Sequence, residues 1–182
     1  YEISACLVGS EMCIRDSHVT LSGDGARFDA DAAYLGKNSQ TIDYNIVADH
    51  FGKKTESLIT VNGALTDSAK KVFRGTIDFK KGSADSVGSE NETVLMLGDD
   101  VVNKTVPLIL CAEENVEGTH GATIGELDAD TMFYFESRGI DRETAEKIMA
   151  YAAVERLIHM ADDSEFAAEV EKDMGIKTDT EE

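Results

Sequence analysis

One histidine, His120, is the residue of this chain best suited to do chemistry. It stands between two glycines in the segment Gly118-Thr-His-Gly-Ala-Thr-Ile-Gly, where a strand pattern stops and a helix pattern begins. Flanking glycines permit a tight, exposed turn. A neutral imidazole is also a competent ligand for iron. The segment therefore predicts a turn from which a metal-binding histidine projects.

Two other side chains are candidates for the same chemistry. Cys111 lies shortly before His120, so its thiolate would share an iron site with the imidazole if the turn brings the two together. The simpler interpretation of Cys111 is burial, since a single cysteine on an apolar strand usually acts as a small hydrophobe. Glu92 lies in another strand pattern, where the alternatives are a solvated glutamate and a cluster ligand.

The elements that position these residues alternate apolar and polar side chains with a period of two, which predicts half-buried strands. No helical pattern separates the strands, which excludes a doubly wound α/β sheet and leaves a sandwich, a barrel or a solenoid. The apolar positions are Ile42, Tyr44, Ile46, Ile59, Val61, Leu65, Phe73, Ile77, Phe79, Val106, Leu108 and Leu110.

The pattern becomes helical after Leu127. Asp128 and Asp141 are suitable N-caps for two helices, and Gly139 followed by Ile140 suits a Schellman ending between them. A third helix is predicted to begin at Asp163 or Ser164. The expected apolar face of the second helix consists of Ala145, Ile148, Met149 and Ala152, and that of the third of Phe166, Val170 and Met174.

The composition excludes several classes of partner. The chain has 36 acidic and 17 basic residues and a formal net charge of −19. Nucleic acids and anionic membranes would repel so negative a protein. No apolar run approaches the roughly 18–20 residues that cross a bilayer. Of the 3 cysteines, Cys6 and Cys13 lie in the N-terminal stretch described next, which leaves Cys111 alone. No disulfide framework is therefore expected, and the prediction is a cytoplasmic protein.

The first residues are predicted to be foreign to the protein. The stretch from Cys6 to Ser17 reads like one translated frame of a transposon-type sequencing adaptor. Residues 1–17 are therefore expected to pack poorly, and the remainder to be the C-terminal part of a longer protein. The expected divisions are an N-terminally truncated core (18–127), a helical domain (128–176) and a disordered acidic tail (177–182).

A family resemblance adds to what composition and periodicity indicate. The segment that contains His120, with the later Phe133-Tyr-Phe-Glu-Ser-Arg-Gly-Ile140, resembles the C-terminal signature of the SufB/SufD family of iron–sulfur cluster assembly scaffolds. The resemblance extends from Asn45 to Met174, and Val72–Phe79 looks like one rung of that family's core. It implies a right-handed parallel β-helix followed by a C-terminal α-helical domain.

The resemblance also implies a function. Such a protein would be a non-catalytic scaffold that works with a SufC-type ATPase and with a SufB-type paralogue or a second copy of itself. An iron–sulfur cluster would be held transiently at a subunit interface. His120 matches the SufD histidine at that site, whereas Glu92 stands where SufB proteins carry the sulfur-accepting cysteine. The expected ATPase contacts are Phe133, Tyr134, Ile148 and Tyr151.

Other interpretations stay open on the sequence alone. One is a SufB-like scaffold that pairs with itself in a minimal system, and others are a β-helix polysaccharide lyase and a purely structural solenoid. A lyase needs carboxylates and a basic residue along one sheet face, and no such pattern is present. The sequence does not decide the sulfur donor, the client proteins, the cluster type or the involvement of a flavin.

Overall fold

The structure, a computed structural model, describes residues 2–6 and 12–174. Within this part of the chain nine strands precede three helices. The strands are β1 (Glu2–Cys6), β2 (Met12–Leu21), β3 (Arg27–Gly36), β4 (Thr41–His50), β5 (Glu56–Leu65), β6 (Lys70–Phe79), β7 (Ser86–Met96), β8 (Val102–Cys111) and β9 (Val116–Glu126). The helices are α1 (Ala129–Ser137), α2 (Arg142–Ala161) and α3 (Ser164–Met174).

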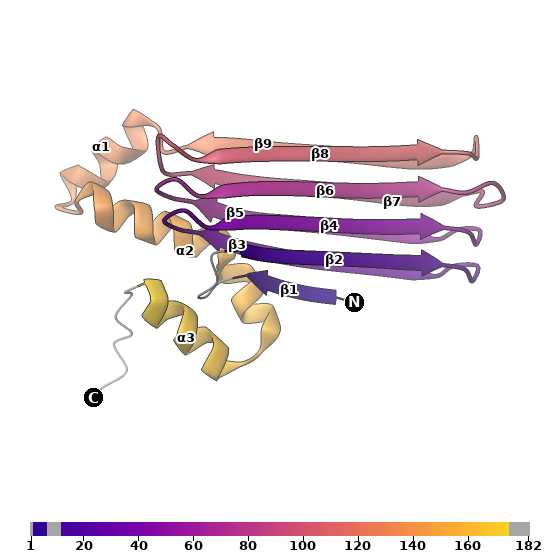
Figure 1. The fold of residues 1–182 in the computed structure, drawn as a ribbon, viewed down its shortest axis with the longest axis horizontal. Coiled ribbons are helices and arrows are strands. Elements are labelled where there is room, and N and C mark those ends of the chain that lie inside the picture. The colour runs from indigo at the N-terminus through magenta and orange to yellow at the C-terminus, as the bar shows by residue number, and fades with distance from the viewer. Residues whose placement is uncertain (1, 7–11, 175–182) are drawn as a thin grey trace.

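The strands wind into a parallel β-solenoid (Figure 1). Odd-numbered strands form one sheet in the order β1-β3-β5-β7-β9, and even-numbered strands form the other in the order β2-β4-β6-β8. All seven pairings are parallel and in continuous register. The segment Leu58–Phe79 therefore contains no antiparallel hairpin, and the predicted β-helix with C-terminal helices is confirmed.

The core lies between the two sheets and is filled by alternate residues of each strand. Phe73, Ile77 and Phe79 of β6 are fully buried, and Ile59 and Val61 of β5 face them in the same core. Burial of such side chains contributes roughly 1.5–3 kcal/mol each. The alternation seen in the sequence thus identified the inner face of these strands correctly.

Strand β8 is an exception. Val106, Leu108 and Leu110 were expected in the core, yet they are 52%, 46% and 42% exposed. Their register partners on β6 are Arg74, Thr76 and Asp78, which occupy the outer face of the sheet. Partners in a parallel ladder point to the same side, so the hydrophobic row faces outward. The inner positions of β8 hold Asn103, Thr105, Pro107, Ile109 and Cys111.

The predicted helix boundaries are confirmed by their caps. Asp128 accepts a hydrogen bond from the Thr131 amide at 2.6 Å, and Asp141 accepts one from the Thr144 amide at 2.8 Å. Gly139 has a φ of +78°, and the Ile140 amide donates back to the Phe135 carbonyl at 3.1 Å, as in a Schellman motif. For α3, the cap is Asp163, which accepts from the Glu165 and Phe166 amides.

Helix α2 lies along one side of the solenoid, where it crosses several rungs and packs mainly against β3 and β5 (Figure 1). The predicted apolar face of α2 was partly wrong, because Ile148 and Ala152 are exposed. The face of α2 that packs against the sheet instead includes Val154 and Leu157. This second core consists of Ala33, Leu35, Ala64, Ala150, Val154, Leu157, Ile158 and Val170. The helices and the solenoid therefore share buried side chains.

The backbone of the predicted adaptor takes part in the solenoid. Met12–Ser17 belongs to β2 and pairs with Thr41–Ile46 of β4. Met12 and Ile14 are each 60% exposed. Leu7 and the predicted tail at 177–182 lie outside the described residues, so the adaptor origin and the domain divisions stay predictions. Among the described helices, none has the length and hydropathy needed to span a membrane.

Candidate functional site at the open end of the solenoid

His120 lies within a strand, which corrects the predicted turn. It is the fifth residue of β9 (Val116–Glu126), and the helical pattern begins only after that strand ends. The change of period was placed too early, because two glycines beside a histidine suggested a turn. The prediction that the histidine is accessible is correct, since His120 is exposed.

The flanking glycines serve packing between rungs instead of a turn. Neither Gly118 nor Gly121 is among the described glycines with a positive φ. A Cβ atom on Gly118 would lie 2.8 Å from Ile109 Cγ2, and one on Gly121 would lie 3.2 Å from Asn91 Oδ1. The glycines therefore allow β9 to approach its neighbours closely.

Register places His120 over the interior of the solenoid. His120 pairs with Glu90 of β7, whose side chain is fully buried. Partners in a parallel ladder share a face. His120 therefore lies in an inner column, that is, a row of stacked residues from successive strands that face the interior. Strand β9 is the last of its sheet, as β8 is of the other (Figure 1). The histidine consequently stands at an end of the solenoid that no further described strand covers.

Cys111 is exposed, which corrects its expected burial. It is the last residue of β8 and stacks in register on Phe79 of β6. Its column is the inner one, but no further rung of the described chain covers it, so solvent reaches the thiol. Cys111 and His120 thus belong to the same terminal rung, one from each sheet.

Glu92 is neither a solvated glutamate nor an accessible ligand. Its side chain is fully buried and forms an ion pair with Lys71 of β6. Thr105 of β8 completes the group: its hydroxyl donates to Glu92 Oε2 at 2.5 Å and accepts from Lys71 Nζ at 3.2 Å. Glu92 therefore belongs to a polar cluster inside the solenoid, next to the terminal rung.

Burial changes the acidity of this interior cluster. It lowers the pKa of Lys71, an effect that Glu92 opposes. It raises the pKa of Glu90 to about 7, with the neighbouring charge of Glu92 adding to the shift. Burial, reinforced by Glu92, also raises the pKa of Tyr34 well above its ordinary value. In this cluster, the carboxyl groups of Glu90 and Glu92 lie beside a single ammonium group, that of Lys71.

Sequence reasoning did not single out Lys71 or Glu90, although the pattern contained a signal. Lys71 precedes Phe73 by two positions, and Glu90 and Glu92 precede the buried Val94 in the same phase. Period two places all of them on the inner face. Charged residues are usually assigned to the surface, and only the register shows that Lys71 and Glu92 meet.

The geometry limits what the site can do alone. Across the described residues, no group of three or more His, Cys, Asp or Glu side chains is arranged to hold a metal ion. His120 and Cys111 can each offer one ligand from the terminal rung. Two ligands are fewer than a metal cluster needs, so His120 and Cys111 would not hold one by themselves.

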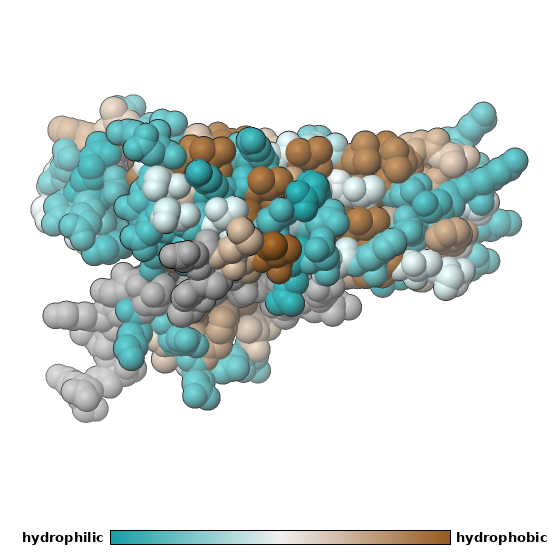
Figure 2. Space-filling view, viewed as in Figure 1, coloured by the Kyte–Doolittle hydropathy of each residue, from teal (hydrophilic) through white to brown (hydrophobic). Residues whose placement is uncertain are grey.

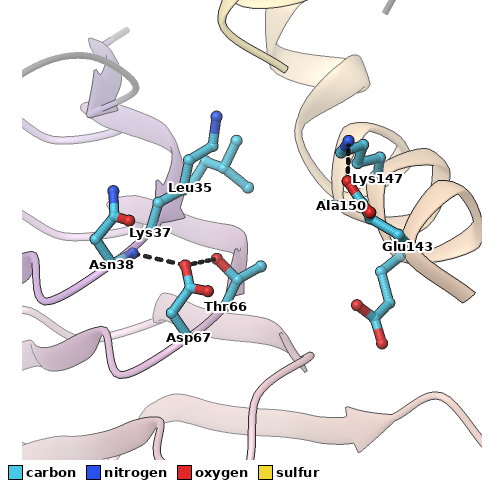
Figure 3. Close-up of a pocket in the computed structure, with 9 residues that line it drawn as sticks. Leu35, Lys37, Asn38, Thr66, Asp67, Glu143, Lys147 and Ala150 are labelled. Atoms are coloured by element: carbon cyan, nitrogen blue, oxygen red, sulfur yellow. Dashed lines mark hydrogen bonds and ion pairs between the residues drawn. The ribbon is translucent and has the colours of Figure 1, made fainter. Parts of the chain in front are cut away.

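A pocket of about 370 Å³ lies elsewhere, between the turns of the solenoid and α2 (Figure 3). Its polar groups are already engaged. Asp67 accepts hydrogen bonds from the Asn38 amide at 2.7 Å and from the Thr66 hydroxyl at 3.0 Å, and Lys147 pairs with Glu143 at 2.7 Å. None of the candidate site residues lines this pocket.

The four predicted partner contacts differ in accessibility. Phe133 and Tyr134 of α1 are 72% and 56% exposed, and Ile148 of α2 is 42% exposed. Tyr151 is only half-buried against the second core and donates to Glu171 at 3.3 Å. Three of the four side chains are thus available for an interface, while Tyr151 also joins α2 to α3.

Comparison with known proteins gives a consistent result. Residues 1–153 match the SufBD core domain of the SUF system for iron–sulfur cluster assembly. The chain is 31% identical over 138 residues to the iron–sulfur cluster assembly protein SufD of Bacillus subtilis, covering 76% of this chain and 32% of that protein. It is 23% identical over 146 residues to SufD of Escherichia coli, covering 80% and 34%.

A plant relative extends the similarity. The chain is 27% identical over 169 residues to a chloroplastic SufBD family protein of Arabidopsis thaliana, covering 93% of this chain and 30% of the relative. The chain therefore spans about a third of the length of these curated relatives.

Proposed function

Because this chain belongs to the SufBD family of iron–sulfur cluster assembly proteins, we propose that it is a SufD-like scaffold subunit. Iron and sulfide, the cargo of the system, would be joined at an interface that this chain forms with a second subunit. The observation that carries the proposal is the exposed His120 on the inner column of the uncovered terminal rung. This proposal is preferred to the two other interpretations of the sequence, a polysaccharide lyase and a purely structural solenoid.

Subunit pairing is supported by the exposed features of β8. Val106, Leu108 and Leu110 form a row of hydrophobic side chains along the outside of this edge strand. Figure 2 shows hydrophobic surface along the upper row of the sheet, over β8. An uncovered edge strand beside apolar surface is typical of a site where another chain adds its own strand. The partner would be a SufB-type paralogue or, in the alternative minimal system, a second copy of this chain.

The buried Glu92 supports the SufD-like assignment over the SufB-like one. A carboxylate cannot accept sulfane sulfur as a thiolate does, and Glu92 is held inside the solenoid by Lys71. Sulfur would therefore reach the interface through the other subunit. In the self-pairing alternative, the exposed Cys111 is the thiol that would have to take this role.

An ATPase of the SufC type would bind the helices and perform the ATP hydrolysis, while this chain would act without catalysis in the cytoplasm. The exposed aromatic pair Phe133 and Tyr134 supports this contact, since aromatic side chains dominate interface energetics. Replacing both with alanine is expected to weaken ATPase binding by at least about thirtyfold, which corresponds to the roughly 2 kcal/mol that a single central aromatic contributes. Surface plasmon resonance with the full-length protein would measure the loss.

A matched control for this experiment is Phe51→Ala. Phe51 is 49% exposed and directly follows β4, whose C-terminal end lies on the side of the solenoid away from the helices. Point variants are preferable to removing residues 128–182, because that deletion would uncover Leu35 and Ala64 in the shared second core. Unchanged affinity in the double variant would place the ATPase elsewhere on the protein.

The proposed function as a whole is tested by purification without air. The full-length protein should be isolated together with an ATPase and a paralogue when the neighbouring genes are expressed with it. The complex should show the visible absorption and Mössbauer signals of an iron–sulfur cluster. A protein that is isolated only with itself would favour the self-pairing alternative, and a complex that never acquires a cluster would contradict the proposal.

A further inference from the structure

Glu90 is a buried carboxylate whose bonding capacity is unused. Neither of its oxygens has a hydrogen-bond partner among the described residues. Space for the group exists because residue 75 on the facing strand is glycine, and a Cβ atom there would collide with Glu90 Oε2. A fully buried, unpaired carboxylate is costly to keep. Such groups are expected to have a partner in the working state of a protein.

The interior of the solenoid does not supply that partner. Lys71 is the ammonium group of the cluster, and it already pairs with Glu92 and contacts Thr105. Two carboxylates thus share one cation. Below Glu90 in its column lies Ile59 of β5, which has no polar side-chain atom. The only remaining neighbour in that column is the residue above it.

That residue is His120. The register pairs Glu90 with His120 directly, and adjacent strands lie about 4.8 Å apart. A glutamate and a histidine stacked at this separation can bring a carboxylate oxygen within hydrogen-bond distance of a ring N–H. Because β9 is a terminal strand, the opposite side of the imidazole remains free for a ligand from outside.

We propose that Glu90 is a positioning residue for His120: in the assembled complex its carboxylate accepts a hydrogen bond from one ring nitrogen. This bond fixes the tautomer and leaves the other nitrogen directed at the subunit interface. Carboxylates behind metal-binding histidines act in this way and also strengthen the ligand. The inference rests on the proposed function of His120 as the group that receives iron.

The test is the affinity of the complete complex for Fe²⁺, or for Co²⁺ as a spectroscopic probe, measured without air. Glu90→Leu is expected to lower the affinity by tenfold to a hundredfold, as loss of a carboxylate behind a ligand does. Glu90→Gln keeps an acceptor oxygen and should lose only several-fold. In a His120→Ala background, neither change should have a further effect, because residues that act through one another are not additive.

Two controls keep the result interpretable. Both Glu90 variants should unfold at a temperature no lower than the unmodified protein, because each removes an unpaired buried charge. Glu117→Gln removes a carboxylate from the exposed outer face of β9, and it should leave metal affinity unchanged. If His120→Ala lowers the affinity but Glu90→Leu does not, the positioning role is wrong. If His120→Ala itself has no effect on affinity, the proposed function of His120 fails, and the inference fails with it.

Discussion

Replacing His120 with alanine is expected to reduce cluster formation in the complete complex to less than about a tenth of its normal rate. The expectation follows from the loss of a metal ligand, since even the residues behind such ligands are worth tenfold to a hundredfold. His120 is exposed on β9 and contributes little to packing, so the fold and ATPase binding should be preserved. The measurement is the growth of visible absorption during anaerobic reconstitution.

The matched control is His159→Ala, which removes an exposed histidine from α2, far along the chain from β9. It should assemble clusters normally. Cys111→Ser, on the same terminal rung, is expected to have a weaker effect than His120→Ala. If His120→Ala reconstitutes at the normal rate, His120 is not the ligand. Cys111 would then be the next candidate for the functional group on this rung.

Replacing Lys71 with methionine is expected to destabilise the protein by about 3–5 kcal/mol, the cost of leaving a buried charge without its partner. Glu92 is fully buried and has Lys71 as its ion-pair partner, and Thr105 depends on the same arrangement. Urea unfolding of the full-length protein, followed by circular dichroism, would measure the loss.

The double variant Lys71→Met/Glu92→Leu should recover most of that loss, because it replaces the pair with apolar groups of similar volume. Lys70→Met is the control: Lys70 is exposed at the adjacent position of β6, and its replacement should change stability by no more than about 0.5 kcal/mol. If Lys71→Met lowers the free energy of unfolding by less than about 1 kcal/mol, the expectation is wrong, and water or another group compensates the charge of Glu92.

Local features of this protein were readable from the sequence because they depend on neighbouring residues. Asp128, Asp141 and Gly139 delimit helices through hydrogen bonds that span a few positions. The strands of the inner rungs were equally clear, since Phe73 and Ile77 can be satisfied only in a core. Periodicity alone did not give the parallel order of the strands, because it is blind to which strands pair. The family resemblance supplied that order.

Apart from the apolar face of α2, the errors lie on the terminal rung and beside it. Hydrophobic Leu108 was placed inside and charged Glu92 outside, and both assignments are reversed in the structure. The glycines around His120, which belong to the terminal strand β9, were wrongly interpreted as a turn. On a terminal rung, no further described strand covers one side, so hydrophobic and polar side chains there do not follow the burial pattern of the inner rungs. Glu92 was misassigned because only the three-dimensional register brings it to Lys71.

The position of Pro107 has a consequence for growth of the solenoid. It is the only proline in the chain, and it lies in the middle of β8, the edge strand. The Val102 amide donates to the carbonyl of Ala69, which directly precedes β6, and the Ala112 amide donates to the carbonyl of Phe79, the last residue of β6. Alternation in a parallel strand therefore turns the backbone nitrogens of the odd-numbered residues, Pro107 included, toward the open edge.

Proline has no N–H to donate. At position 107 this breaks no hydrogen bond between β8 and β6, and it leaves the uncovered side of β8 with one donor fewer. A solenoid with a complete ladder at its end would be a template for copy after copy, adding strands without limit into a filament. The gap at Pro107 makes such indiscriminate stacking less favourable. A strand that paired with this edge would have to compensate for the missing hydrogen bond through its own side chains and register.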